Sequence, residues 1–204
     1  MNASPLFIET IRYADGVFHN LDLHRARMER TCREVYGTDA PQLVLPAGCR
    51  NGVFKCRVTY SQQIEKIELE PYTPVPPRSI RLIECENIDY HLKYADRSRL
   101  GELKALADGC DDIIIVRHRL LTDTSYANIV LHTPQRLLTP AQPLLHGVMR
   151  QRLIADGVLY CEEITTADLL PGNRLGITAV SIINAMLPLG TVPPVSLSDI
   201  IAVR

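Results

Sequence analysis

Lysine, long apolar runs and paired cysteines are all scarce in this sequence of 204 residues. No apolar run is long enough to cross a bilayer. The first residues, MNASPLFIETIRY, lack the basic and apolar regions of a signal peptide. The formal net charge is -1, which gives no electrostatic reason to expect nucleic acid as a partner. We therefore expect a cytoplasmic protein that binds neither nucleic acid nor a membrane.

The six cysteines are scattered along the chain. They form no C-x-x-C pair and show no His/Cys spacing typical of a metal site, so we expect no bound metal. Without a secretion signal, such cysteines are typical of reduced thiols in a protein interior. The sequence therefore predicts that all six are buried and serve packing: Cys32, Cys49, Cys56, Cys85, Cys110 and Cys161.

The first half of the chain predicts a hairpin, a helix and two strands. Apolar residues flank Asp15-Gly16, a pair typical of hairpin turns. In HRARMERTCREVYG, Met28 and Cys32 fall on one helical face and Gly37 provides the end of a helix. The alternating segments GVFKCRVTYS and IEKIELEPY predict the two strands.

Four prolines in the segment PYTPVPPRS mark a boundary. Such a run cannot form a helix interior or a central strand, so it predicts a stiff connector. We predict a small N-terminal domain over residues 1–71, a proline-rich linker over 72–79 and a C-terminal domain over 80–204. The mixture of strands and helices in runs favours two α+β domains.

The second half predicts further strands and short helices. IRLIEC predicts a strand, and residues 96 to 108 predict a helix with Leu100, Leu103 and Ala107 as its apolar stripe. DDIIIVRHRLLTDTSYANIVLHT predicts two strands around a polar turn. Gly147 precedes a predicted short helix, and ITTADLL predicts another helix with a threonine cap. ITAVSIINAMLPLG predicts a buried strand followed by a loop.

Lys93 is one of only four lysines and lies between Leu92 and Tyr94. From its spacing alone, a surface lysine whose stem lies along apolar neighbours is the commoner interpretation. The alternative is an amine nucleophile, because burial disfavours the charged form and lowers the pKa of a lysine. A neutral amine can form a Schiff base with a carbonyl compound such as pyridoxal phosphate (PLP).

PLP requires three further groups, and the sequence offers a candidate for each. An acid must hold the pyridine nitrogen protonated, and Asp123 lies on a predicted strand. Backbone amides at a helix start can bind the phosphate, and such a start follows Gly147. An arginine, here Arg27, can neutralise charge. Each residue also has a common structural role, so only their conjunction favours a cofactor site.

Six motifs connect these candidates between about residue 7 and residue 196: FIETIRYADG, LHRARM, LKYADRSRL, TDTSYANIVL, LLTP with HGVMRQRL, and IINAMLPLGTVPPV. In this order and spacing the chain resembles the class IV aminotransferase superfamily, the fold type IV PLP enzymes. Within that superfamily it looks most like aminodeoxychorismate lyase. The resemblance implies a D-amino-acid aminotransferase-like α+β fold, with a small N-terminal α/β domain and a β-barrel-like C-terminal domain. It also implies a homodimer.

The resemblance further implies roles for individual residues. Lys93 would form the Schiff base with PLP and move protons, and Thr10 would face the substrate. Arg27 would bind the cofactor phosphate, and Asp123 would pair with the pyridine nitrogen. The remaining implied cofactor-binding residues are Asn128 beside that acid, Val148 and Met149 through their amides, and Asn184 and Ala185 in the last loop. Arg97 and Arg150 match motif positions without an implied contact.

The sequence also departs from the family pattern. Asp123 stands where the family usually has glutamate, so its carboxylate is one methylene shorter. Ala185 lacks the hydroxyl that many aminotransferases place near the phosphate. The segment before FIETIR and the loop after FKCRVTY are shorter than in most members. We therefore expect a complete cofactor site and a trimmed substrate site.

Three functions remain open at this point. The first is a lyase of folate biosynthesis, which eliminates pyruvate from 4-amino-4-deoxychorismate to give 4-aminobenzoate. The second is an aminotransferase that acts on D-amino or branched-chain amino acids with a 2-oxo acid. The third is a catalytically weak PLP-binding homologue. The segments NAMLP and GVMRQ and the K-x-x-x-R spacing favour the lyase.

Overall fold

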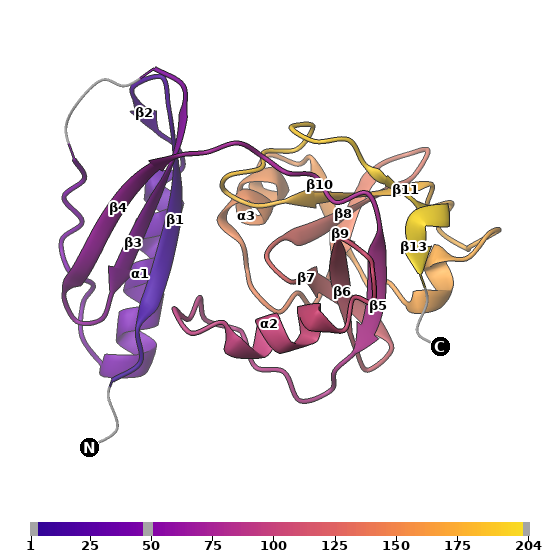
Figure 1. Ribbon diagram of the computed structural model, residues 1–204, viewed down its shortest axis with the longest axis horizontal. Coiled ribbons are helices and arrows are strands. Elements are labelled where there is room, and N and C mark those ends of the chain that lie inside the picture. Colours follow the sequence, from indigo (N-terminus) through magenta and orange to yellow (C-terminus); the bar gives the residue numbers. More distant parts are fainter. Residues whose placement is uncertain (1–3, 47–50, 202–204) are drawn as a thin grey trace. The chain divides into compact units, whose positions relative to one another are not determined.

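The computed structural model describes residues 4–46 and 51–201, and it divides into two compact units (Figure 1). The first unit comprises the residues up to Thr73 together with Leu92–Asp96. The second comprises Pro74–His91 and the residues from Arg97 onward. Both units combine strands with few helices, so the predicted mixed fold class is confirmed. No helix in the described ranges is long and apolar enough to span a membrane.

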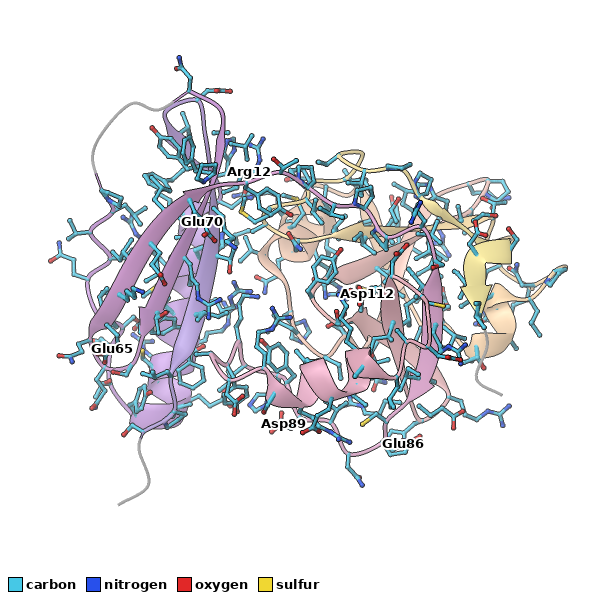
Figure 2. The ribbon with its side chains drawn as sticks, viewed as in Figure 1. Arg12, Glu65, Glu70, Glu86, Asp89 and Asp112 are labelled. Atoms are coloured by element: carbon cyan, nitrogen blue, oxygen red, sulfur yellow. The ribbon has the colours of Figure 1, made fainter. Side chains whose placement is uncertain are left out.

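The first unit is a four-stranded antiparallel sheet with one helix. Its strand order is β2-β1-β3-β4, formed by β1 (Phe7–Ala14), β2 (Val17–Phe18), β3 (Val53–Tyr60) and β4 (Ile64–Pro71). The predicted hairpin is confirmed, because β1 and β2 pair across Asp15 and Gly16, which both have positive φ. Strand β4 forms one edge and carries exposed Glu65 and Glu70 (Figure 2), charges that oppose edge-to-edge pairing.

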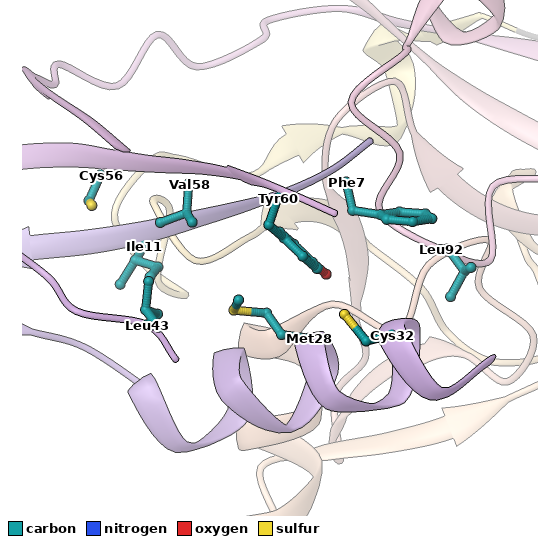
Figure 3. Packing of buried hydrophobic residues seen from close by; sticks show 9 residues of the cluster. All are labelled: Phe7, Ile11, Met28, Cys32, Leu43, Cys56, Val58, Tyr60 and Leu92. Carbon is teal, nitrogen blue, oxygen red and sulfur yellow. The ribbon is translucent and has the colours of Figure 1, made fainter. Parts of the chain in front are cut away.

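Helix α1 (Leu21–Tyr36) supplies the other half of this unit's core (Figure 3). Met28 and Cys32 pack with Phe7, Ile11 and Tyr60, and all five are buried. Burial of each large apolar side chain contributes about 1.5–3 kcal/mol. The helix ends at Gly37, whose left-handed backbone lets its N–H reach the last turn, as predicted.

A five-residue segment from later in the chain completes the first unit. Leu92 is buried in the core around α1, and the Tyr94 ring lies 5.2 Å from the Phe7 ring. The Ile8 N–H donates to the Lys93 carbonyl at 2.9 Å, so the segment lies along the edge of β1. This segment lies within the predicted C-terminal domain, 80–204, whereas its contacts group it with the first unit.

The second unit contains a mixed nine-stranded sheet. Its main order is β10-β9-β8-β7-β6-β5-β13, and β11 branches from β8 and pairs with β12. The strands are β5 (Ile80–Glu84), β6 (Asp112–Arg117), β7 (Leu120–Thr124), β8 (Asn128–His132), β9 (Leu137–Pro140), β10 (Leu159–Glu162), β11 (Ala179–Ile183), β12 (Val195–Ser196) and β13 (Ile200–Ile201). The helices are α2 (Ser98–Ala105) and α3 (Val148–Ala155), with 3₁₀ turns η1 (Thr166–Leu169) and η2 (Leu197–Asp199).

The prediction of two strands in the segment DDIIIVRHRLLTDTSYANIVLHT was wrong, because the segment forms three: β6, β7 and β8. The first of the two turns between these strands is formed by His118 and Arg119, both with positive φ. Such turns usually carry Asn-Gly or Asp-Gly, which are absent here. The Glu86 carboxylate instead holds this turn by accepting the His118 N–H at 2.9 and 3.1 Å.

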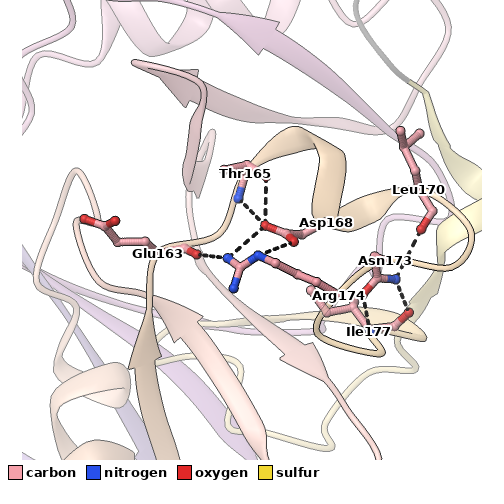
Figure 4. Close-up of polar contacts among 7 residues, drawn as sticks. All are labelled: Glu163, Thr165, Asp168, Leu170, Asn173, Arg174 and Ile177. Atoms are coloured by element: carbon pink, nitrogen blue, oxygen red, sulfur yellow. Dashed lines mark hydrogen bonds and ion pairs between the residues drawn. The ribbon is translucent and has the colours of Figure 1, made fainter.

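Two predicted helices are present in shorter form. Helix α2 begins at Ser98 and ends at Ala105, and its predicted stripe of Leu100, Leu103 and Ala107 is buried. The predicted helix in ITTADLL is a 3₁₀ turn with Thr165 at its N-cap position (Figure 4). Asp168 accepts the Thr165 N–H and hydroxyl and pairs with Arg174, so one buried carboxylate organises this turn.

The prediction that all cysteines are buried was wrong for two of them. Cys161 is exposed because it lies on β10, an edge strand of its sheet, and Cys110 is half-buried in the loop before β6. Cys32, Cys56 and Cys85 are buried, and the five thiols in the described ranges are all free. The prediction for Cys49 lies outside the described residues.

Candidate cofactor site

A buried carboxylate on β1 anchors the arginine that the sequence analysis proposed for phosphate binding. Arg27 donates through Nε to Glu9 Oε1 at 2.8 Å and through Nη2 to Glu9 Oε2 at 2.5 Å. The Nδ1 atom of His24 lies 2.6 Å from the same Oε2. Two parallel bonds fix both the position and the plane of a guanidinium. Arg27 is therefore held rigidly at the N-terminal half of α1.

The charge of Arg27 decides the ionisation of Glu9. Burial alone raises the pKa of Glu9, but the Arg27 guanidinium and the hydrogen bonds from Arg27 and His24 lower it to about 2. Glu9 is therefore ionised at neutral pH and only accepts hydrogen bonds, so His24 donates through Nδ1. Removal of one partner from a buried ion pair costs about 3–5 kcal/mol, because the other charge is left uncompensated.

Arg27 was expected at this site from the sequence, whereas Glu9 and His24 were not. The strand pattern could have indicated Glu9, because residues 7, 9 and 11 lie on the same face of β1. Phe7 and Ile11 pack against α1 from that face. A carboxylate in that register must be buried, and a buried carboxylate needs a cation nearby. His24 and Arg27 are three residues apart and so lie on one helical face.

Lys93 lies in a rigid part of the segment that borders β1. Its neighbours Leu92 and Tyr94 both pack into the core of the first unit, and Tyr94 N–H donates to the Leu92 carbonyl at 3.0 Å. Lys93 itself is half-buried. Phe7 pairs with Tyr94 in an antiparallel bridge, which places Lys93 opposite Ile8. Opposite residues of paired strands share a face of the sheet.

Strand alternation therefore sorts the candidate residues of the first unit into two groups. Thr10 and Lys93 belong to the face of Ile8, and Thr10 is half-buried there. Glu9 points to the opposite face, where it binds Arg27. The structure thus brings Thr10 and Lys93 onto one face of β1, and it places the Glu9–Arg27 pair on the other.

In the second unit, Asp123 lies near the end of β7 with both carboxylate oxygens bonded. Oδ1 accepts the Asn128 side-chain amide at 2.8 Å, and Oδ2 accepts the Leu145 N–H at 2.8 Å. Asn128 also donates to the Leu145 carbonyl at 2.8 Å. Asp123 and Asn128 are direct partners across β7 and β8. This closed set of bonds fixes the orientation of the carboxylate.

Asp123 differs from Glu9 in its ionisation. Burial raises the pKa of Asp123 to about 6, although the Leu145 and Asn128 hydrogen bonds and the charge of Arg150 act in the opposite direction. Two neutral amides stabilise a carboxylate less than a bound guanidinium does. Asp123 is therefore mostly ionised at neutral pH, but it takes up a proton in mildly acidic solution.

Gly147 lies between the Asp123 cluster and the start of α3, because it packs against Asn128 and directly precedes the helix. A Cβ at Gly147 would lie 2.0 Å from Asn128 Oδ1, so only glycine lets the chain pass so close. Its φ of -65° is accessible to any residue. Glycine is therefore required here by the lack of room for a Cβ and not by the backbone conformation. Helix α3 begins directly afterwards at Val148 and has no side-chain cap. The amides of Val148 and Met149 have no carbonyl acceptor within the helix, because they belong to its first turn.

The last loop meets the same region. Asn184 Oδ1 accepts the N–H groups of Met186 and Leu187 at 2.8 and 3.0 Å, which closes a tight turn after β11. Its neighbour Ile183 pairs with Asn128 across β11 and β8. The structure therefore brings Asp123, Asn128 and Asn184 to one end of adjacent strands, with Ala185 half-buried in the turn.

The two arginines without an implied contact have clear partners in the second unit. Arg97 donates through Nη2 to the Ser125 carbonyl at 2.6 Å, in the turn between Asp123 and Asn128. Ser125 in turn donates its hydroxyl to buried Asp112 at 2.5 Å. Arg150 donates to Thr139 and to the Pro140 carbonyl. Arg97 therefore braces the turn that follows the buried acid, whereas Arg150 ties α3 to β9.

Solved structures define the class to which this fold belongs. A "putative 4-amino-4-deoxychorismate lyase" from Haemophilus somnus is 27% identical, has a TM-score of 0.78 and matches over 92% of this chain and 99% of its own. A "hypothetical aminotransferase" from Mycobacterium tuberculosis, in a PLP-bound form, shares the fold at 15% identity with a TM-score of 0.72, over 98% of this chain and 82% of its own. The predicted resemblance to class IV aminotransferases, and to aminodeoxychorismate lyase among them, is confirmed.

The family itself is shown by a sequence relative. No protein-family model matches the chain. An uncharacterized protein of Haemophilus influenzae is 32% identical over 189 residues, which cover 89% of this chain and 97% of the relative. The chain belongs to the same family as that protein.

Proposed function

We propose that the protein is a PLP-dependent enzyme of class IV that acts on a small-molecule amine. Two sets of residues would hold the cofactor. The first set that we propose is Lys93, Thr10 and Arg27. The second set is Asp123 with Asn128, the amides of Val148 and Met149, and the turn of Asn184 and Ala185. The observation that carries the proposal is the buried Asp123 cluster, which fixes an acid beside an uncapped helix start.

The residues present suit the cofactor's phosphate. A phosphate monoester is a dianion near neutral pH, and helix N-termini favour such anions through their amides and dipole. Gly147 supports this role, because its close approach to Asn128 fixes where α3 begins relative to Asp123. Arg27 is already oriented by Glu9, so we propose that its guanidinium donates hydrogen bonds to the phosphate from a fixed position.

Asp123 suits the pyridine nitrogen. A carboxylate has about four lone-pair positions, and the amides of Asn128 and Leu145 use two of them. The ionised acid can therefore accept a further N–H and hold the pyridine nitrogen protonated. PLP supplies an electron sink in that form. The two amides also fix the direction of the aspartate side chain.

Lys93 and Thr10 would handle the protons. Lys93 carries the only amine among the proposed site residues, and it would take the proton from the substrate carbon that bears nitrogen. Thr10 belongs to the same face of β1, so its hydroxyl can serve as proton donor to a leaving group. Leu92 and Tyr94, which flank Lys93 and pack into one core, hold its backbone in place.

Within this class, we propose elimination of pyruvate from 4-amino-4-deoxychorismate to give 4-aminobenzoate. The full-length similarity to the Haemophilus somnus protein supports this reaction, as do the NAMLP and GVMRQ segments. Transamination with a 2-oxo acid is the second candidate, supported by the fold shared with the Mycobacterium tuberculosis protein. We further propose a homodimer.

The test compares the purified protein with Lys93→Ala. We expect a visible absorption band from lysine-bound PLP in the wild type and its loss in the variant. Borohydride reduction of the wild type should attach the cofactor covalently to Lys93, which peptide mass spectrometry can detect. Lys55→Ala, which removes a surface lysine paired with Glu70, is the matched control and should keep the band. A wild type that stays colourless with added PLP would refute the proposal.

The reaction is then assigned by product. Release of pyruvate from 4-amino-4-deoxychorismate without consumption of a 2-oxo acid supports the lyase. Consumption of a 2-oxo acid with an amino acid donor supports the aminotransferase and contradicts the lyase. Thr10→Val should slow pyruvate release by about 100-fold while PLP binding is kept, because a positioned proton donor contributes about 10²–10⁴-fold.

A further inference from the structure

Arg150 is a buried cation without a carboxylate partner. Among the described residues, Arg27 and Arg150 are the buried arginines, with 6% and 3% of their surface exposed. Arg27 is paired with ionised Glu9, so that pair is formally neutral. Arg150 forms no ion pair within the described ranges, and guanidinium remains charged in proteins. One buried positive charge is therefore left uncompensated in the second unit.

The contacts of Arg150 all go to neutral acceptors. Its Nε donates to Thr139 Oγ1 at 3.3 Å, and its Nη2 donates to the Pro140 carbonyl at 2.8 Å and to Cys161 Sγ at 3.3 Å. These bonds tie α3 to β9 and β10. They satisfy donors, but they do not balance the charge. Burial of an unbalanced charge is costly, so a compensating anion is expected nearby.

The position of Arg150 makes this charge unusual. It is the third residue of α3, so it lies in the first helical turn, where the helix dipole is already positive. Helices usually place Asp or Glu there, and the first turn of α3 contains no acidic residue. The nearby buried acid is Asp123, whose pKa the charge of Arg150 lowers. Asp123 is not within ion-pair distance of Arg150 in the described structure, so it compensates the charge only in part.

We propose that Arg150 is a positioning residue whose charge raises the affinity of the first turn of α3 for a phosphate monoester dianion, acting through the amides of Val148 and Met149 without touching the phosphate. This inference rests on the proposed PLP site and assigns the source of its positive potential. The competing explanation is mechanical: Arg150 would only clamp α3 onto β9 and β10.

The test isolates the phosphate by comparing two ligands, PLP and pyridoxal, which lacks the phosphate. Dissociation constants are measured by equilibrium dialysis at fixed ionic strength and about pH 8, where a phosphate monoester with a second pKa of about 6 is a dianion. The ratio of the pyridoxal constant to the PLP constant reports the phosphate contribution. The variants are Arg150→Gln, which keeps donors without charge, and Arg150→Lys, which keeps charge without the planar fork. Arg152→Gln removes a half-buried charge from the same helix and is the control.

We expect Arg150→Gln to lower the ratio by about 10- to 100-fold, as a single charge acting at several ångströms in a partly buried site would. Arg150→Lys and Arg152→Gln should keep the ratio within about threefold of the wild type. Thermal stabilisation of the apo protein by inorganic phosphate should follow the same order among the variants.

The outcomes separate this inference from the proposed function. A wild type that binds neither ligand refutes the PLP site itself. A wild type that binds PLP, with an unchanged ratio in Arg150→Gln, refutes only the role of Arg150. If Arg150→Gln does not fold, Arg150→Lys and Thr139→Val decide, since both keep the charge but weaken the clamp. A tenfold loss of the ratio in either variant would assign the effect to the clamp and overturn the proposal.

Discussion

Glu9 in the first unit and Asp123 in the second are both almost completely buried, yet their pKa values are displaced in opposite directions, to about 2 and about 6. Burial raises the pKa in both cases. Glu9 has a bidentate guanidinium against it, whereas Asp123 is bonded only to neutral amides. The comparison teaches that the bonded partner, rather than depth, decides whether a buried acid is a fixed charge or a proton acceptor.

The strongest way to break the comparison is Glu9→Gln. This change leaves the Arg27 guanidinium buried without a counter-charge, and we expect a loss of about 3–5 kcal/mol in the free energy of unfolding. Urea denaturation measures the loss. Glu70→Gln on the edge strand β4 is the matched control, because its pair with Lys55 is open to solvent and should contribute little to stability. Equal losses in the two variants would show that the Glu9 pair has no special weight.

The pH dependence of stability should sharpen the comparison. The pKa of Glu9 is lowered from 4.5 to about 2, so its contribution is present above pH 4.5 and is lost as the pH falls toward 2. The pKa of Asp123 is raised from 3.8 to about 6, so its contribution is fully present below pH 3.8 and is lost as the pH rises through 6. Each difference corresponds to about 3 kcal/mol.

The two pH effects are separated by variants. Urea denaturation of the apo protein across this range should show a decline in stability between about pH 4 and pH 7 that Asp123→Asn removes. Glu9→Gln should instead remove the decline on the acid side. A wild-type decline that persists unchanged in Asp123→Asn would contradict the assignment of the raised pKa to Asp123.

A smaller effect should follow from Gly147→Ala, which disturbs only the Asp123 cluster. The added Cβ would meet Asn128 Oδ1 at 2.0 Å, so the amide or the start of α3 must move. We expect a loss of about 1–3 kcal/mol in stability, as for other overpacked sites, together with weaker PLP binding. Gly101→Ala in α2 has open space and should stabilise by about 0.5–1 kcal/mol. PLP affinity that is unaltered in Gly147→Ala would argue against the α3 start as the phosphate site.

Much of the fold could be predicted because the signals are local. Asp15-Gly16 predicted a hairpin, Gly37 predicted the end of α1, and Gly147 predicted the start of α3, and each is confirmed. The presence of three strands rather than two in residues 111–133 was not predicted, and the positive φ values at His118 and Arg119 are held by Glu86 from a distant segment. A turn that is stabilised by a residue from another part of the chain has no signal in its own sequence.

The residues of the candidate site likewise fall into those that the sequence predicted and those that it did not. Asp123, Arg27 and Lys93 were found because their chemistry follows from residue type and motif. Glu9 was missed because its importance depends on a pairing between β1 and α1, which are separate in sequence. The charge of Arg150 was equally hidden, since only the structure shows that its partners are neutral. Whether these residues act together in catalysis stays a prediction.

The segment Leu92–Asp96 has a practical consequence for anyone who dissects this protein. The first unit is discontinuous, because its core includes Leu92, which lies beyond the proline-rich stretch. A fragment cut at residue 73 would lose Leu92 and the Tyr94 ring that lies against Phe7. Phe7 and the edge of β1 would then be exposed to solvent, which promotes aggregation. A stable fragment of the first unit must therefore include residues 92–96, joined to it by a designed linker, in addition to the N-terminal residues.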